Sequence, residues 1–260
     1  MTERLAPDLS PPLSPARSKV PEVTLLFWAI KIAATTLGET GGDAVSMSMG
    51  LGYVVGTAVF AVVFGVAVAA QIRARRFHPW LYWATIVAST TVGTTLADFA
   101  TRSLGIGYLG GTLLLSALLA ASLLAWHRIL GTISVESVAT PRAEGFYWMT
   151  IMLSQTLGTA VGDWTDDTAG LGYAGAAVLF GGLLLAVVAA YYWTNVSRTV
   201  LFWAAFVLTR PLGAVVGDFL DKPLDHGGLA LSRFTASAVL VAFIAVCIAV
   251  FPQRAAQKAH

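Results

Sequence analysis

Residues 28–43 read WAIKIAATTLGETGGD, and the pattern that begins at Trp28 returns at Trp83, Trp148 and Trp203. In every copy a glycine stands ten residues after the tryptophan, a glycine or alanine follows four residues later, and the next residue is aspartate. The small residues are Gly38, Gly42, Gly93, Ala97, Gly158, Gly162, Gly213 and Gly217, and the acids are Asp43, Asp98, Asp163 and Asp218. Ionisable side chains are costly inside a bilayer, so four such acids in membrane spans indicate a functional site.

The composition is that of a membrane protein. Hydrophobic residues make up 57% of the 260-residue chain and charged residues only 12%, about half the charged share of an ordinary soluble domain. Eight apolar stretches are long enough to cross a bilayer as helices. We place them at residues 23–40, 52–71, 80–98, 107–126, 146–164, 171–193, 200–220 and 229–251. The sequence therefore predicts an all-α, polytopic membrane protein with eight transmembrane helices.

The distribution of basic residues predicts the orientation. With eight spans, both termini and the even-numbered loops lie on one side, which carries eleven of the 16 Lys and Arg residues. The opposite side carries Arg102, Lys222 and Arg233, whereas Lys31 and Arg210 fall inside spans. By the positive-inside rule, both termini are expected in the cytoplasm. The net charge of +2 then follows from topology and does not indicate nucleic-acid binding.

The tryptophan spacing divides the chain into two halves of two repeats, because the first and third intervals are equal and the middle one is longer. Each repeat contributes two helices, so every repeat enters the membrane in the same direction. The repeats are therefore expected to be parallel, around a pseudo-symmetry axis on which the aspartates face one another. We assign a disordered cytoplasmic tail (1–22), repeat 1 (23–77), repeat 2 (78–130), a cytoplasmic linker (131–145), repeat 3 (146–197), repeat 4 (198–251) and a cytoplasmic tail (252–260).

The aspartates are expected to form a cation or proton site. If each tryptophan lies at the inner interface, its aspartate is roughly 22 Å deeper, in the outer half of the bilayer. Glu39 adds a carboxylate and is the candidate proton carrier, and Lys31 and Arg210 are expected to compensate charge. Carboxylate oxygens suit hard cations such as Mg²⁺, Mn²⁺ or Ca²⁺. The metal ligands would be Asp43, Asp98, Asp163, Asp218 and Glu39.

Structural roles are open for the same residues. Glycines four residues apart allow close helix packing, and tryptophans commonly anchor spans at the membrane interface. The aspartates could instead cap the outer helix ends or orient the glycine-rich turns that follow them. Four further acids are expected to be solvated in outer loops: Asp166, Asp167, Asp221 and Asp225.

The Gly-Glu-Thr-x2-Asp sequence of the first repeat is followed by Gly50-Leu51-Gly52-Tyr53, and similar turns begin at Gly105 and Gly170. These features resemble a bacterial family of membrane-anchored proteins that are built from a short repeat of unknown function. The resemblance covers residues 23–251 and implies a location in the bacterial inner membrane, but it implies no activity. The fourth repeat departs from the pattern, because it lacks the turn and carries Arg210-Pro211.

We expect an inner-membrane transporter that exports a hard divalent cation such as manganese, with or without proton coupling. Two other classes stay open: a passive cation or proton channel along the symmetry axis, and a non-transporting membrane scaffold. No enzyme is expected, because no nucleophile–base pair or His-x3-His array lies in the spans. The expected partners are membrane lipid and the transported cation, and no cofactor is expected.

Overall fold

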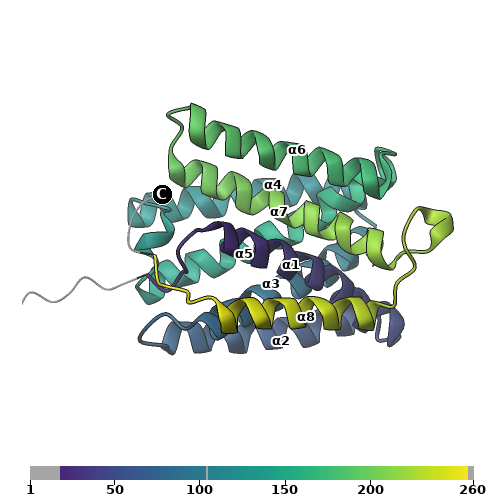
Figure 1. Cartoon of the computed structure of the whole chain (residues 1–260), viewed down its shortest axis with the longest axis horizontal. Coiled ribbons are helices and arrows are strands. Elements are labelled where there is room, and N and C mark those ends of the chain that lie inside the picture. Colours follow the sequence, from purple (N-terminus) through teal and green to yellow (C-terminus); the bar gives the residue numbers. More distant parts are fainter. Residues whose placement is uncertain (1–17, 104, 257–260) are drawn as a thin grey trace, which may run out of the picture.

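The computed structural model describes residues 18–103 and 105–256, and this part of the chain is all-α. Its long helices lie side by side along the longest axis of the molecule (Figure 1). They are α1 (Leu25–Asp43), α2 (Gly52–Arg73), α3 (Pro79–Asp98), α4 (Gly107–Leu130), α5 (Pro141–Asp163), α6 (Gly172–Trp193), α7 (Arg198–Asp221) and α8 (Arg233–Val250). Five of them, α2, α4, α6, α7 and α8, are long and apolar enough to cross a membrane. The all-α class is therefore confirmed.

Four helices form an inner ring. α1 packs against α3 and α7, and α5 packs against the same two helices, so the four close on one another. Of the residues in the most apolar 18-residue stretch of α7, 67% are buried inside the protein, compared with 6% for α2 and 11% for α6. The ring therefore consists of the helix that begins each repeat, and these are the helices that carry the tryptophan, the glycines and the aspartate.

The outer helices cover the next repeat rather than their own. α2 packs against α3, α4 against α5, and α6 against α7, while α8, the last helix, packs against α1. Figure 1 shows α6 alongside α7 and α8 alongside α1. The outward faces of these helices are apolar, as at Val62, Leu113, Leu185 and Val239. Each outer helix thus joins two consecutive repeats, and the last one joins the fourth repeat to the first.

The first glycine of each repeat lies where the next inner helix passes closest. A Cβ atom at Gly38 would lie 2.3 Å from Oγ1 of Thr90, and one at Gly158 would lie 2.2 Å from Cγ of Arg210. The equivalent pairs are Gly93 with Gln155 and Gly213 with Thr35. All four contacted residues stand seven positions after a tryptophan. A larger residue at any of these glycines would overlap the root of a side chain on the neighbouring helix.

The second small residue of a repeat faces the residue that stands eleven positions after the next tryptophan. A Cβ atom at Gly42 would lie 3.1 Å from Cγ2 of Thr94, and one at Gly217 would lie 2.7 Å from Cβ of Glu39. Gly162 meets Ala214 in the same way, at 3.2 Å. The spacing of four between the two small residues therefore matches two successive turns of the neighbouring helix.

Glycine-rich turns follow the first three inner helices. Each of these helices passes into a five-residue π-helical turn directly after its aspartate. Gly50 and Gly52 then have φ angles of 68° and 73°, and the glycines of the other two turns have similar values. Glycine enters this left-handed region without steric cost, which explains the recurring signature. The fourth repeat lacks the signature because α7 continues to Asp221 and a different turn, with Gly227 at φ 83°, leads toward α8.

Aromatic side chains fill one end of the ring. Trp83, Trp148 and Trp203 are at most 5% exposed and pack against the aromatic residues that precede them in the chain. The hydroxyl groups of Tyr82 and Tyr147 lie 2.6 Å apart within this cluster. The expectation of interfacial anchors is wrong for these three tryptophans, because their rings pack inside the protein instead of facing lipid headgroups.

Three chain segments meet at the aromatic end, and we call them the terminal clasp: residues 18–22, 133–138 and 253–256. The backbone amide of Lys19 donates to Val138 O at 3.0 Å, and the amide of Ala256 donates to Val20 O at 2.8 Å. Two ring tryptophans donate to the clasp: Trp83 to Gln253 Oε1 at 2.7 Å and Trp203 to Ile133 O at 3.0 Å. The clasp therefore joins both ends of the described chain to the linker between the two halves.

The clasp corrects part of the expected domain division. Residues 18–22 were assigned to a disordered tail, yet Ser18, Lys19 and Val20 are buried. The ammonium of Lys19 lies 2.6 Å from the carboxylate of Glu144, a residue of α5. The expectation of disorder is thus wrong for residues 18–22, whereas residues 1–17 and 257–260 lie outside the described residues.

Candidate functional site

A stripe of side chains at every fourth position lies on the buried face of each inner helix. On α1 the stripe is Lys31, Thr35, Glu39 and Asp43. The equivalent residues are Ile86, Thr90, Thr94 and Asp98 on α3, Ile151, Gln155, Thr159 and Asp163 on α5, and Phe206, Arg210, Ala214 and Asp218 on α7. None of these residues is more than 4% exposed. Because four residues are close to one helical turn, the stripes form successive levels inside the ring.

Arg210 joins all four inner helices at one level. Its Nη2 atom donates to Oε2 of Glu39 at 3.0 Å and to the hydroxyl oxygens of Thr94 and Thr159. The three acceptors come from α1, α3 and α5, and each stands eleven residues after its tryptophan. The Arg210 side chain is fully buried. The planar guanidinium, which presents several donors in fixed directions, suits such a position between several acceptors.

The aspartate level is held by cations from the adjoining loops. Nζ of Lys222 lies 2.6 Å from Asp43 and 2.9 Å from Asp218. Arg102 lies 3.0 Å from Asp98 and 3.5 Å from Asp163. Each cation therefore bridges the aspartate of its own repeat and the aspartate of the next repeat. Repeats 2 and 4 supply these cations and repeats 1 and 3 do not, so the charge pattern repeats twice around the ring rather than four times.

Lys222 stays charged in this position. Burial disfavours the ammonium form, but the carboxylates of Asp218, Asp43 and Asp221 outweigh that effect and raise the pKa of Lys222 above its usual value. A third cation, Arg233, is the first residue of α8 and lies 2.7 Å from Asp221 and 3.6 Å from Asp43. The aspartate level is thus partly neutralised by fixed positive charge.

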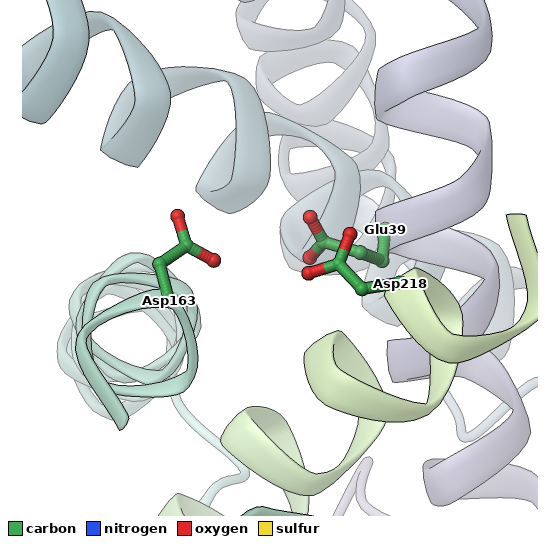
Figure 2. A group of neighbouring side chains, drawn as sticks. All are labelled: Glu39, Asp163 and Asp218. Carbon is green, nitrogen blue, oxygen red and sulfur yellow. The ribbon is translucent and has the colours of Figure 1, made fainter. Parts of the chain in front are cut away.

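One group of carboxylates has the spacing of a metal site. Glu39, Asp163 and Asp218 each offer an oxygen atom, and these oxygens all lie within 4.8 Å of one another. Figure 2 shows the three side chains converging from three different inner helices. All three residues are buried. The group therefore brings together acids that are far apart in the sequence, in a setting from which water is largely excluded.

The other predicted ligands are placed differently. Asp43 belongs to a second buried group, with Asp218 and Asp221, whose oxygens also lie within 4.8 Å of one another. Asp98 belongs to neither group and is paired with Arg102. The structure therefore brings three of the five predicted ligands into one cluster, shares Asp218 between two clusters, and leaves Asp98 outside both.

The two internal cations differ in their surroundings. Arg210 is paired with Glu39, as described above, whereas Nζ of Lys31 has no hydrogen-bond partner in the described part of the chain. The Lys31 ammonium lies 4.1 Å from the centre of the Phe206 ring. Lys31 therefore does not neutralise a carboxylate in this structure.

Sequence reasoning missed four contributors to the site: Arg102, Lys222, Arg233 and Asp221. A signal existed for two of them, because Arg102 and Lys222 each stand four residues after an aspartate, a spacing at which opposite charges pair. The expectation that Asp166 and Asp221 are solvated is wrong, because they are 7% and 9% exposed. Asp221 is buried because α7 extends one turn further than the other inner helices before its loop begins. Asp225 is exposed, as expected, and Asp167 lies outside the residues whose side chains the structure describes.

Comparison with known proteins supports the repeat. A family model described as a Repeat of Unknown Function (DUF347) matches four stretches, residues 26–77, 81–132, 146–197 and 201–253. Together these matches cover well over half of the chain, and they confirm the resemblance seen in the sequence motifs. No curated protein and no solved structure matches the chain.

Proposed function

The chain belongs to the family built from this repeat of unknown function, and on this premise we propose that it is a cation transporter of the bacterial inner membrane. Its substrate is a hard divalent metal ion, such as manganese, which the protein exports. The observation that supports this proposal is the buried group of Glu39, Asp163 and Asp218, contributed by three inner helices. Acids within a membrane are rare and mark ion pathways or proton relays.

The proposed topology has eight spans in four parallel two-helix repeats. α1, α3 and α5 would cross the membrane together with α7, the fourth helix of the ring, and the outer helices α2, α4, α6 and α8, which pack around the ring. The glycine contacts support parallel repeats. Gly38 of α1 lies against Thr90 of α3, and Gly42, one turn later, lies against Thr94, so these two helices run in the same direction. The clasp supports a common side for both termini, because it joins residues 18–22 to residues 253–256.

A reporter fused after His260 tests this topology. We expect a fluorescent protein fused there to be bright in the cytoplasm, and an alkaline phosphatase fused there to be inactive, because basic residues are concentrated on the side of the termini. Active phosphatase at the C-terminus would show that the number of spans is odd or that the orientation is reversed.

The geometry suits a hard divalent ion. Oxygens on opposite sides of an ion are about 4.0–4.2 Å apart around Mg²⁺ and about 4.6–5.2 Å apart around Ca²⁺. The oxygens of Glu39, Asp163 and Asp218 lie within 4.8 Å of one another, which is no further apart than opposite ligands of a Ca²⁺ ion. An arriving ion would compete with Arg210 for Glu39. Arg210 would then return to Glu39 after the ion leaves, so the buried carboxylate keeps a positive partner throughout the cycle.

A passive channel is the weaker alternative, because Arg210 crosses the ring at the level of Glu39, Thr94 and Thr159. A fixed positive charge in the middle of the ring opposes free passage of cations. A scaffold is favoured by a different observation, namely that Lys222 and Arg102 tie the aspartates of neighbouring repeats together. In that case the acids would serve folding alone, and no enzymatic activity is proposed in either case.

Flux through liposomes separates these proposals. We expect Asp163→Asn to reduce Mn²⁺ flux at least tenfold while the protein remains folded, because asparagine keeps the shape of the side chain but cannot ionise. Arg102 would retain Asp98 as its partner. The matched control is Asp225→Asn, which removes one exposed carboxylate and should leave flux unchanged.

The outcome decides between transport and scaffolding. Wild-type flux in Asp163→Asn would exclude this carboxylate as an ion ligand, and no flux of any cation in the unmodified protein would favour the scaffold. A pH-sensitive dye inside the same liposomes reports whether protons move in the opposite direction. A channel would show flux that does not saturate and that moves no protons against their gradient.

A further inference from the structure

Three fully buried side chains inside the ring have polar atoms without partners. Nζ of Lys31, Nε and Nη1 of Arg210, and both amide atoms of Gln155 make no hydrogen bond in the described part of the chain. All three side chains have an exposed fraction of 0%. Buried polar groups are almost always hydrogen bonded, to protein or to something bound. These atoms therefore need a partner that the protein itself does not supply.

The three residues occupy neighbouring levels between the aromatic cluster and the aspartates. Gln155 and Arg210 each stand seven residues after a tryptophan. Each lies against a glycine of the preceding repeat: Gln155 against Gly93, and Arg210 against Gly158. Lys31 is one level closer to the aromatic end. Its ammonium lies over the ring of Phe206, which is one helical turn before Arg210 on α7.

The unpartnered groups are mostly hydrogen-bond donors. An ammonium carries three N–H groups, Nε and Nη1 of a guanidinium carry three more, and an amide nitrogen carries two. The one unpartnered acceptor among the three side chains is the amide oxygen of Gln155. Glu39 balances the charge of Arg210, but no described carboxylate balances Lys31. With Lys31 protonated, this region has one positive charge and several donors in excess, and a buried ammonium without a partner is strongly unfavourable.

We propose that Lys31, Gln155 and Arg210 bind a small monovalent anion of the halide class, chloride being the probe, inside the ring. An anion accepts hydrogen bonds and supplies the missing negative charge. The other side chains at the level of Lys31 are Ile86, Ile151 and Phe206, all fully buried, and such apolar surroundings suit a small, singly charged ion better than a strongly hydrated, multivalent one. The site shares Arg210, the partner of Glu39, with the carboxylate cluster, but it binds an ion of the opposite sign and does not require cation transport.

Thermal unfolding of the purified protein tests the proposal. The melting temperature is measured in sodium chloride and in sodium gluconate at equal ionic strength, so that general salt effects cancel. We expect chloride to produce a saturable rise in Tm of about 2–5 °C, because a ligand that binds only the folded state stabilises it. Bromide should act similarly, and crystals grown in bromide should show its anomalous signal beside Nζ of Lys31.

Variants distinguish chloride binding at this site from other effects of chloride on stability. Lys31→Met should be at least as stable as the unmodified protein in gluconate, because it removes an unpaired buried charge, and it should lose the response to chloride. Gln155→Leu should weaken chloride binding at least tenfold. The control is Arg75→Met, which removes one exposed positive charge and should respond as the unmodified protein does. If Lys31 is instead a neutral amine hydrogen bonded to water, the unmodified protein shows no chloride-specific shift; that result, or an unchanged shift in Lys31→Met, overturns the proposal.

Discussion

A single methyl group at Gly158 is expected to destabilise the fold strongly. The Cβ atom of Gly158→Ala would lie 2.2 Å and 2.4 Å from Cγ and Cβ of Arg210, and 3.0 Å from Cδ of Pro211. These atoms are close to the backbone of α7 and cannot move aside as the end of a flexible side chain can, so the helices must separate. Overpacking of this kind costs about 3 kcal/mol. The measurement is the unfolding free energy in detergent, together with the folded yield from size-exclusion chromatography.

The control for this variant is Gly181→Ala on α6. A Cβ atom there meets nothing within 4 Å, and alanine raises helix propensity by up to about 1 kcal/mol over glycine. The two variants make the same chemical change, so the difference between them measures the close approach of α5 and α7. Equal stabilities would show that the glycine is not needed for helix packing.

Arg210→Met is expected to destabilise the protein by about 3–5 kcal/mol, because it leaves the buried carboxylate of Glu39 without its cation. The hydroxyl groups of Thr94 and Thr159 lose the same partner. Chemical unfolding in detergent measures the loss. The reason can be tested directly, since Glu39→Gln removes the charge that Arg210 compensates.

The double variant Arg210→Met/Glu39→Gln should therefore be more stable than Arg210→Met alone. A double-mutant cycle with these variants gives the coupling free energy between the two side chains. If the two effects simply add, the pair seen at 3.0 Å contributes no coupling, and the loss in Arg210→Met must come from packing and from the lost hydrogen bonds to Thr94 and Thr159.

The sequence was informative wherever a signal repeats along the chain. Hydropathy predicted helices in every stretch where the structure has a long helix, and the recurring tryptophan, glycine and aspartate marked the four helices that form the ring. The aspartates lie at one level because their repeat positions are equivalent. Local periodicity and repeat position carry this information, and neither depends on knowing which helices touch.

The sequence could not predict which side chains of different repeats contact one another. Glu39, Thr94 and Thr159 share a repeat position, but their common contact with Arg210 exists only after four helices close into a ring. The inward packing of Trp83 could not be separated from an interfacial position, because both environments favour tryptophan. Ser18 and Lys19 follow a proline-rich stretch that is typical of disorder, and their burial depends on hydrogen bonds to residues more than a hundred positions away.

The packing of α8 on α1 has a consequence for synthesis on the ribosome. The first helix to be synthesised is covered by the last, so its polar residues remain without their final neighbours until translation is complete. We expect the insertion machinery or a chaperone to hold the nascent chain during this interval. A chain truncated before Arg233 should be recognised by quality-control proteases as incomplete, even though it contains the whole inner ring.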